Sequence, residues 1–427
     1  MKIFKDLYSR LKSSEFFLHF TILLSGAVLA KVITLLTYPV ITRIYSPEEF
    51  GTFSLFTSIV TILAPISMLK YNVAIVTAHN DTDSKNLFIF SVLVSFFFSM
   101  IILLSFFFGE EFFKNILDAH KLNFWWYVIP LCVFITSLSD VIDRYLNRFK
   151  NYLLMSKTSI IRSLSYSILV LTTGYIGLTY LGLFFAHILA LCISIIFVII
   201  IINPSLKINY LKIYKDFSNL SKKYVRFPKY DLIATLLNNL TTMMPIFFLN
   251  KFFTDATVGF YALAIKTVFF PLALISSSLS KIHLRKSKEL IDKKGNLKKY
   301  MIKLSFILFC IVSPPSLLFF VYGPEIFSLV FGNDWRLSGR FIQILIPALS
   351  LIFIVSTLSP IFYSTGKIYL YSNWSKIYFL TLIVFFYFQS ETLNVENLLF
   401  YYSCINILMY SIYFFLIFYS IKDLKIR

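Results

Sequence analysis

Long apolar segments separated by short polar stretches make up most of the chain. A helical segment of about 20 apolar residues spans the ~30 Å hydrocarbon core of a membrane. The segment 163–206 contains no Asp, Glu, Lys or Arg and is too long for one helix, so Gly174, Gly177 and Gly182 mark a turn between two. The pattern therefore predicts twelve transmembrane helices, two in 163–206 and one each in 16–40, 50–69, 86–109, 122–139, 232–250, 257–280, 304–324, 341–366, 368–388 and 397–421.

The composition agrees with an all-α polytopic membrane protein. Of the 427 residues, 58% are hydrophobic and 14% are charged, and the mean hydropathy is +0.77. Soluble proteins carry about 25% charged residues. These values exclude a soluble enzyme and a disordered protein. The formal net charge of +19 does not indicate binding of nucleic acid, because the basic residues are distributed for a different reason.

Lysines and arginines gather on one side of the predicted helices. With the N-terminus in the cytoplasm, 32 of the 40 fall in cytoplasmic segments, 6 fall in the opposite loops, and Lys31 and Lys266 fall inside helices. Cytoplasmic segments of membrane proteins carry such an excess of basic residues. We therefore expect both termini in the cytoplasm, where the basic segments also attract anionic bilayer lipids.

The two halves of the chain resemble each other at equivalent places. Residues 39–55 and 245–263 each run from a proline through a basic residue and an acidic turn to Gly-x-aromatic-small-Leu. A parallel repeat of this kind predicts two six-helix lobes related by a pseudo-two-fold axis along the membrane normal. We expect the N-terminal lobe at 1–205, a cytoplasmic amphipathic linker at 206–228 and the C-terminal lobe at 229–427. Chance similarity between apolar segments is the alternative explanation of the repeat.

Lys31 and Lys266 lie near the centres of their predicted spans. A charge at this depth costs about 2.5–3.5 kcal/mol, and a lysine side chain does not reach the interface ~10 Å away. One interpretation is a water-filled cavity between the lobes that presents both amines. The other is a pair of buried lysines that contact carboxylates or carbonyls. The sequence places no carboxylate at this depth, which favours the cavity.

Polar residues recur at helical spacing on the helices of the repeat. The candidates to line the cavity are Thr34 and Tyr38 on the first helix, and Asn238 and Thr242 on the seventh. Such residues also mediate packing between membrane helices, which is the alternative interpretation.

Charged residues at helix ends are weaker candidates. Arg43, Lys70 and Lys251 would gate the cavity or anchor the ends of their helices. Three carboxylates, Asp140, Asp143 and Asp231, are candidates for proton or cation coupling, with a local salt-bridge cluster as the alternative at Asp140 and Asp143. The sequence contains no motif for a catalytic nucleophile, a phosphate-binding loop, a metal site or a cofactor.

Four short motifs resemble the polysaccharide-transport flippases. YPVITRIYSPEEFG at 38–51 resembles the exit of the family's first helix, and LKYNVAIV at 69–76 resembles the end of its second. YVRFP at 224–228, then GFYALA at 259–264 with Pro271-Leu272, are similar to the family's second half. Where the family often has Arg-Tyr-Glu, this chain has Lys70, Tyr71 and Asn72, so a carboxylate is missing at Asn72.

The resemblance implies a Wzx-type flippase of the multidrug/oligosaccharidyl-lipid/polysaccharide exporter superfamily. Such proteins move undecaprenyl-diphosphate-linked oligosaccharide from the inner to the outer leaflet of the bacterial inner membrane, for O-antigen or capsule assembly. It also implies a polysaccharide polymerase and a chain-length regulator of the same pathway as partners. Lys31 and Lys266 would bind the diphosphate, and Tyr38 and the polar residues near it would contact the glycan.

Three other functions compete with this one. A drug antiporter of the same superfamily needs an intramembrane carboxylate for coupling, and the predicted span centres hold none. A membrane polymerase or acyltransferase would need a large outer loop or a histidine among other polar residues, and the sequence has neither feature. A scaffold without transport activity does not explain the two central lysines.

Overall fold

The computed structural model describes residues 15–78, 80–202, 219–293, 295–389 and 391–422, and every regular element within them is helical. The helices form two compact units. The N-terminal unit comprises Met1–Tyr45 and Leu55–Leu240, and the C-terminal unit comprises Ser46–Ser54 and Thr241–Arg427. The chain therefore passes from one unit to the other three times: between Tyr45 and Ser46, within α3 (Pro47–Ser67) and within α11 (Leu232–Phe252).

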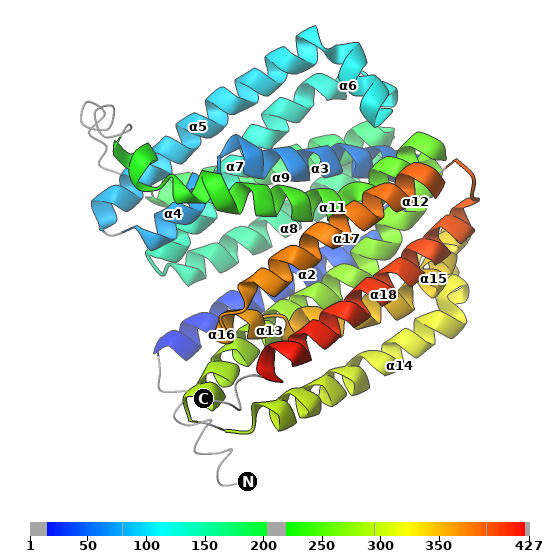
Figure 1. The fold of residues 1–427 in the computed structure, drawn as a ribbon. Helices are drawn as coiled ribbons and strands as arrows, with labels where there is room; N and C mark the ends of the chain where they lie inside the picture. Colours follow the sequence, from blue (N-terminus) through cyan, green and yellow to red (C-terminus); the bar gives the residue numbers. More distant parts are fainter. Residues whose placement is uncertain (1–14, 79, 203–218, 294, 390, 423–427) are drawn as a thin grey trace. The chain divides into compact units, whose positions relative to one another are not determined.

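The N-terminal unit is built from long antiparallel helices with short connections (Figure 1). Besides parts of α3 and α11, it contains α2 (Glu15–Ile44), α4 (Tyr71–Thr77), α5 (Asp81–Phe108), α6 (Glu110–Leu117), η1 (His120–Leu122), α7 (Trp125–Arg148), α8 (Tyr152–Tyr175), α9 (Thr179–Ile202) and the π-helical η3 (Phe227–Asp231). The pairs α2 and α8, α8 and α9, and α5 and α7 pack against each other.

The C-terminal unit follows the same plan. It contains α12 (Asp255–Ala264), the π-helical η4 (Ile265–Phe269), α13 (Phe270–Asp292), α14 (Leu297–Phe331), η5 (Asn333–Trp335), α15 (Arg336–Leu358), α16 (Ile361–Ser364), α17 (Ile368–Gln389) and α18 (Val395–Lys422). Here α15 packs against α14, α13 and α18 (Figure 1).

Ten helical segments of the described residues are long and apolar enough to cross a membrane. They are Gly26–Ile44, Pro47–Ser67, Asp81–Phe108, Trp125–Arg148, Thr179–Ile202, Leu232–Phe252, Asp255–Asp292, Leu297–Phe331, Asn333–Ser364 and Val395–Lys422. Two more helices, α8 and α17, have 24 and 22 residues but carry charged and hydroxylated side chains. The all-α polytopic membrane fold is thus confirmed, while the count of twelve and the cytoplasmic location of the termini stay predictions.

The fifth helix begins earlier than the sequence predicts. We expected it to begin at residue 163, but α8 begins at Tyr152, where the side chain of Asn151 accepts a hydrogen bond from the Leu154 backbone N–H at 3.3 Å. Lys157 and Arg162, which we had assigned to a cytoplasmic loop, therefore lie within the helix. The prediction was wrong because it began the span only where the charge-free segment begins, directly after Arg162. Most of the predicted linker at 206–228 lies outside the described residues.

Hydroxyl groups join α2 to α8. Thr34 Oγ1 lies 2.6 Å from Ser163 Oγ, and Thr37 Oγ1 lies 2.7 Å from Ser167 Oγ. Tyr45 Oη donates to the Val170 carbonyl at 2.9 Å. Contacts of this kind hold helices together where apolar packing has no preference over lipid. Thr34, a candidate to line the cavity, thus also serves helix packing.

Candidate functional site

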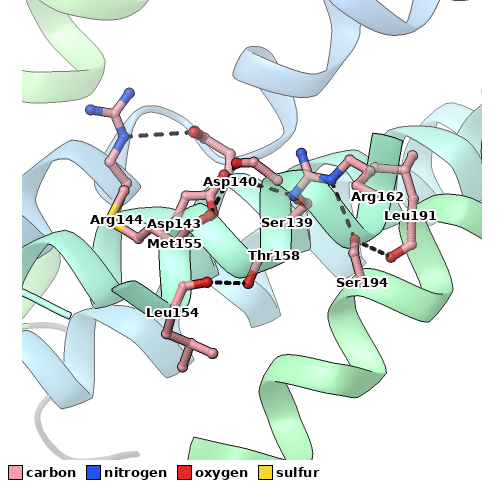
Figure 2. Close-up of polar contacts among 11 residues, drawn as sticks. Ser139, Asp140, Asp143, Arg144, Leu154, Met155, Thr158, Arg162, Leu191 and Ser194 are labelled. Carbon is pink, nitrogen blue, oxygen red and sulfur yellow. Dashed lines mark hydrogen bonds and ion pairs between the residues drawn. The ribbon is translucent and has the colours of Figure 1, made fainter. Parts of the chain in front are cut away.

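A polar network lies between α7, α8 and α9 in the N-terminal unit (Figure 2). Its centre is Arg162 of α8, which lies near the middle of that helix, ~15 Å along the axis from Tyr152. The guanidinium Nη2 donates to Ser139 Oγ at 2.7 Å, and Nε donates to Ser194 Oγ at 3.3 Å. Nη2 also lies 3.8 Å from Asp143 Oδ2, which makes an ion pair.

These partners explain why an arginine is tolerated so far into an apolar helix. A charge at the centre of a membrane helix costs about 2.5–3.5 kcal/mol on insertion scales. A hydrogen bond to a charged group contributes about 1.5–3 kcal/mol. Ser139 and Ser194, on the two helices that flank α8, together offset the cost, and Asp143 balances the charge.

A second acidic residue joins the network from the same face of α7. Asp140 Oδ1 lies 3.6 Å from Arg144 Nε, and the amide of Asn72 donates to Asp140 Oδ2. Asn72 is fully buried in α4. A glutamate at this position would place a second carboxylate beside Asp140, whereas the asparagine amide donates a hydrogen bond to the Asp140 carboxylate. The departure from the family motif at Asn72 therefore has a local physical explanation.

Lys31 lies close to this network. Its side chain is exposed on α2, one turn before Thr34, which contacts the residue that follows Arg162. Arg162 and Lys31 are near enough for a repulsive electrostatic interaction. The N-terminal unit therefore brings three cations, Lys31, Arg144 and Arg162, together with the carboxylates Asp140 and Asp143.

The second central lysine, Lys266, has a different environment in the C-terminal unit. It belongs to η4, a π-helical insertion between α12 and α13, and such insertions are frequent at functional sites. Its Nζ lies 3.2 Å from Ser54 Oγ and 4.5 and 5.2 Å from the ring centroids of Phe50 and Phe53. Cation–π contacts of this kind stabilise a cation by about 0.5–2 kcal/mol. The half-buried amine thus contacts a hydroxyl and two aromatic faces.

Of the four remaining charged candidates, two are exposed and two form an ion pair with each other. Arg43 and Lys251 are exposed near the ends of α2 and α11, as anchors or gates would be. Lys70 Nζ lies 3.7 Å from Asp231 Oδ2, with side chains 14% and 45% exposed. Asp231 is therefore paired with Lys70, which lies two residues before Asn72.

Three polar candidates complete the predicted set: Tyr38, which is half-buried on α2, and Asn238 and Thr242, which are exposed one turn apart on α11. None of the three is among the residues labelled in Figure 2.

Arg162, Ser139 and Ser194 were missed by sequence reasoning. A usable signal was present, because Arg162 follows two isoleucines and lies ten residues into the helix that begins at Tyr152. Within the described ranges, no three His, Cys, Asp or Glu side chains come together in a way that could hold a metal ion.

The arrangement of helices matches transporters of one superfamily. A structure described as lipid II flippase MurJ in an inward closed conformation superimposes with a TM-score of 0.72 at 13% identity, covering 94% of this chain and 87% of that one. An inward-facing multidrug resistance MATE transporter of the MOP superfamily gives 0.67 at 16% identity, covering 94% and 95%. A MATE transporter from Vibrio cholerae gives 0.58 at 14% identity, covering 98% and 99%. The chain therefore shares the fold of these solved transporters.

The family can be stated more narrowly. A model of the polysaccharide biosynthesis protein family matches residues 40–339, most of the chain, so this protein belongs to that family. No curated protein matches it. The solved structures that share its fold are described as a flippase and as a multidrug transporter.

Proposed function

We propose that the protein is a flippase for lipid-linked oligosaccharides in polysaccharide biosynthesis. The observation that carries the proposal is the set of cations held among membrane-spanning helices in a member of the polysaccharide biosynthesis family. Lys31 and Arg162 lie in one unit and Lys266 in the other. Ionisable side chains within membrane-spanning helices are costly and mark the paths of substrates or ions, and cations favour an anionic substrate.

The substrate class follows from charge and chemistry. A diphosphate carries several negative charges and takes charge-assisted hydrogen bonds from lysine and arginine. We propose undecaprenyl-diphosphate-linked repeat units for O-antigen or capsule, with Lys31 and Lys266 on the diphosphate. Thr34, Tyr38, Asn238 and Thr242 are the proposed glycan contacts. The lipid chain would stay among the bilayer lipids.

The direction and the mechanism are part of the proposal. The repeat unit would move from the inner to the outer leaflet of the bacterial inner membrane by alternating access of the two lobes. Arg43, Lys70 and Lys251 are proposed to gate the path or anchor helix ends, and Asp140, Asp143 and Asp231 are candidates for ion coupling. A polymerase and a chain-length regulator of the same pathway would receive the product.

A deletion strain tests the proposal. Loss of surface polysaccharide together with single lipid-linked repeat units on the inner leaflet supports the flippase. Repeat units that reach the outer leaflet but stay unpolymerised would instead indicate a polymerase. Complementation with the intact chain is the control, because it must restore the surface glycan.

One observation favours a second candidate, a drug antiporter of the same superfamily. The candidate span Trp125–Arg148 contains Asp140 and Asp143, so a coupling carboxylate is available within the helices after all. An antiporter predicts unchanged lipid-linked sugars in the deletion strain and increased accumulation of cationic dyes. The two candidates therefore give opposite results for surface polysaccharide.

A further inference from the structure

The ion pair between Arg162 and Asp143 is not a sealed structural contact. The two side chains are 31% and 33% exposed, and the Nη2–Oδ2 separation of 3.8 Å is longer than a direct hydrogen bond. The serine contacts at 2.7 and 3.3 Å hold Arg162 independently of Asp143. Loss of the carboxylate charge would therefore leave the guanidinium in place.

The charges around the pair determine what it can bind. Asp143 experiences Arg162 from α8 and Asp140 and Arg144 from its own helix. From α4, the uncharged Asn72 contacts Asp140, and from α9 the uncharged Ser194 contacts Arg162. Lys31 of α2 repels Arg162 electrostatically. With Asp143 ionised, the pair is neutral. With Asp143 protonated, Arg162 is an uncompensated cation near a second cation.

We propose that Asp143 masks Arg162, and that protonation of Asp143 frees Arg162 to bind the diphosphate headgroup of a lipid substrate. One proton passes from solvent to a carboxylate oxygen of Asp143, and no other bond changes. The guanidinium exchanges the carboxylate for a phosphate oxygen, with Ser139 and Ser194 keeping it in position. Binding is thereby coupled to uptake of one proton. This inference rests on the proposed function, because it takes the headgroup of that substrate class as the anion.

The test measures binding to the purified full-length chain in lipid nanodiscs. Farnesyl diphosphate is the lipid probe, and inorganic pyrophosphate is the soluble one. Binding is measured by calorimetric titration between pH 5.5 and 8. Repeating the titrations in buffers of different ionisation enthalpy gives the number of protons taken up on binding. For the unaltered chain we expect binding that weakens as pH rises, with uptake of about one proton near the midpoint.

Two variants that each remove one charge should change the affinity for farnesyl diphosphate in opposite directions. Asp143→Asn should bind farnesyl diphosphate roughly tenfold more tightly at pH 8, because a neighbouring charge typically shifts such equilibria by one to three powers of ten. The affinity of this variant should then depend on pH only through the titration of the probe's own phosphates. Arg162→Gln should lose most binding at every pH, and Arg162→Lys should retain part of it. The Asp81→Asn and Arg148→Gln variants are controls, because they alter an ion pair of 3.1 Å elsewhere in the same unit.

Several outcomes would overturn the inference. Asp143→Asn binding as the unaltered chain does, or more weakly, would show that the carboxylate does not mask the cation. Arg162→Gln with undiminished binding, in protein that melts as the unaltered chain does, would show that the phosphate lies elsewhere. If Arg162→Gln does not fold, the Asp143→Asn result still decides.

The two probes distinguish the source of the phosphate. Pyrophosphate binding as tight as farnesyl diphosphate binding would indicate a site for free phosphates and contradict the lipid headgroup. Neither probe carries a glycan, so the binding titrations test only the site at Asp143 and Arg162. The flippase function is tested separately, in the deletion strain. A deletion strain with normal surface polysaccharide would reject the function while leaving the binding result as measured.

Discussion

Gly51 and Gly259, which occupy equivalent places in the two sequence repeats, lie directly against each other. A Cβ atom on Gly51 would lie 1.9 Å from the Asp255 carbonyl oxygen, and one on Gly259 would lie 1.9 Å from the Pro47 carbonyl oxygen. Two equivalent positions can meet only near the axis that relates them. The reciprocal contact therefore supports the pseudo-two-fold repeat, and it explains why both repeats have glycine there.

Alanine at either glycine should destabilise the protein. Because the obstructing atoms are backbone carbonyls, α3 and α12 would have to separate, and overpacking of this kind costs about 1–3 kcal/mol. Thermal melting of the purified protein should show a lower midpoint for Gly51→Ala and Gly259→Ala. Gly295→Ala is the matched control, because its nearest obstruction is the mobile end of the Leu290 side chain at 2.9 Å. Equal melting of all three variants would contradict the close contact.

Replacing Lys31 and Lys266 together by alanine should abolish transport. If each amine makes a charge-assisted contact to the diphosphate, its loss costs about 1.5–3 kcal/mol. Complementation of the deletion strain, read as surface polysaccharide, measures the effect. Lys293→Ala, which removes a lysine side chain that is 73% exposed just after α13, should complement normally. Normal surface polysaccharide with the double variant would reject the role of the two lysines.

Asn72→Asp should destabilise the N-terminal unit. The new carboxylate would be buried beside Asp140, and an uncompensated buried charge costs about 3–5 kcal/mol. Protonation removes the repulsion, so the destabilisation should grow as pH rises and shrink as pH falls. Melting curves between pH 5 and 8 measure this trend. Asn72→Ala is the control, since it loses the amide but adds no charge, and its destabilisation should show a weaker pH trend.

Lys70 should tolerate glycine better than alanine. Its backbone is left-handed, with φ of 62°, which is unfavourable for residues other than glycine by about 1–2 kcal/mol. Both substitutions remove the contact with Asp231, and a partly exposed ion pair contributes about 0–1 kcal/mol. Only glycine relieves the backbone strain, so Lys70→Gly should melt above Lys70→Ala. The reverse order would mean that the strain at Lys70 is not significant.

Hydropathy alone was sufficient to predict the class of fold, because helices that span a membrane must carry long apolar segments. The repeat also identified Gly51 and Gly259 as equivalent positions, but the contact between them is evident only in the folded chain. The pattern failed at Arg162, because charge was taken as the sign of a loop. In the folded unit, Ser139, Ser194 and Asp143 offset that charge, and none of them is adjacent to it in sequence.

The surroundings of Lys266 could be predicted only in part. Its position within a span was evident, and its depth implied that something must contact the amine. The partners Phe50, Phe53 and Ser54 could not be identified, because the π-helical η4 changes the direction in which the side chains after α12 point. A pattern based on 3.6 residues per turn contains no information about such an insertion.

The most direct test of the flippase account is translocation by the purified chain itself. Proteoliposomes would carry a fluorescent undecaprenyl-diphosphate-linked repeat unit in both leaflets, and a membrane-impermeant reductant would quench the outer one. The account predicts that quenching continues to completion when the protein is present and stops at the outer-leaflet fraction in empty liposomes. The same plateau with and without protein, in vesicles shown to contain folded chain, would contradict it.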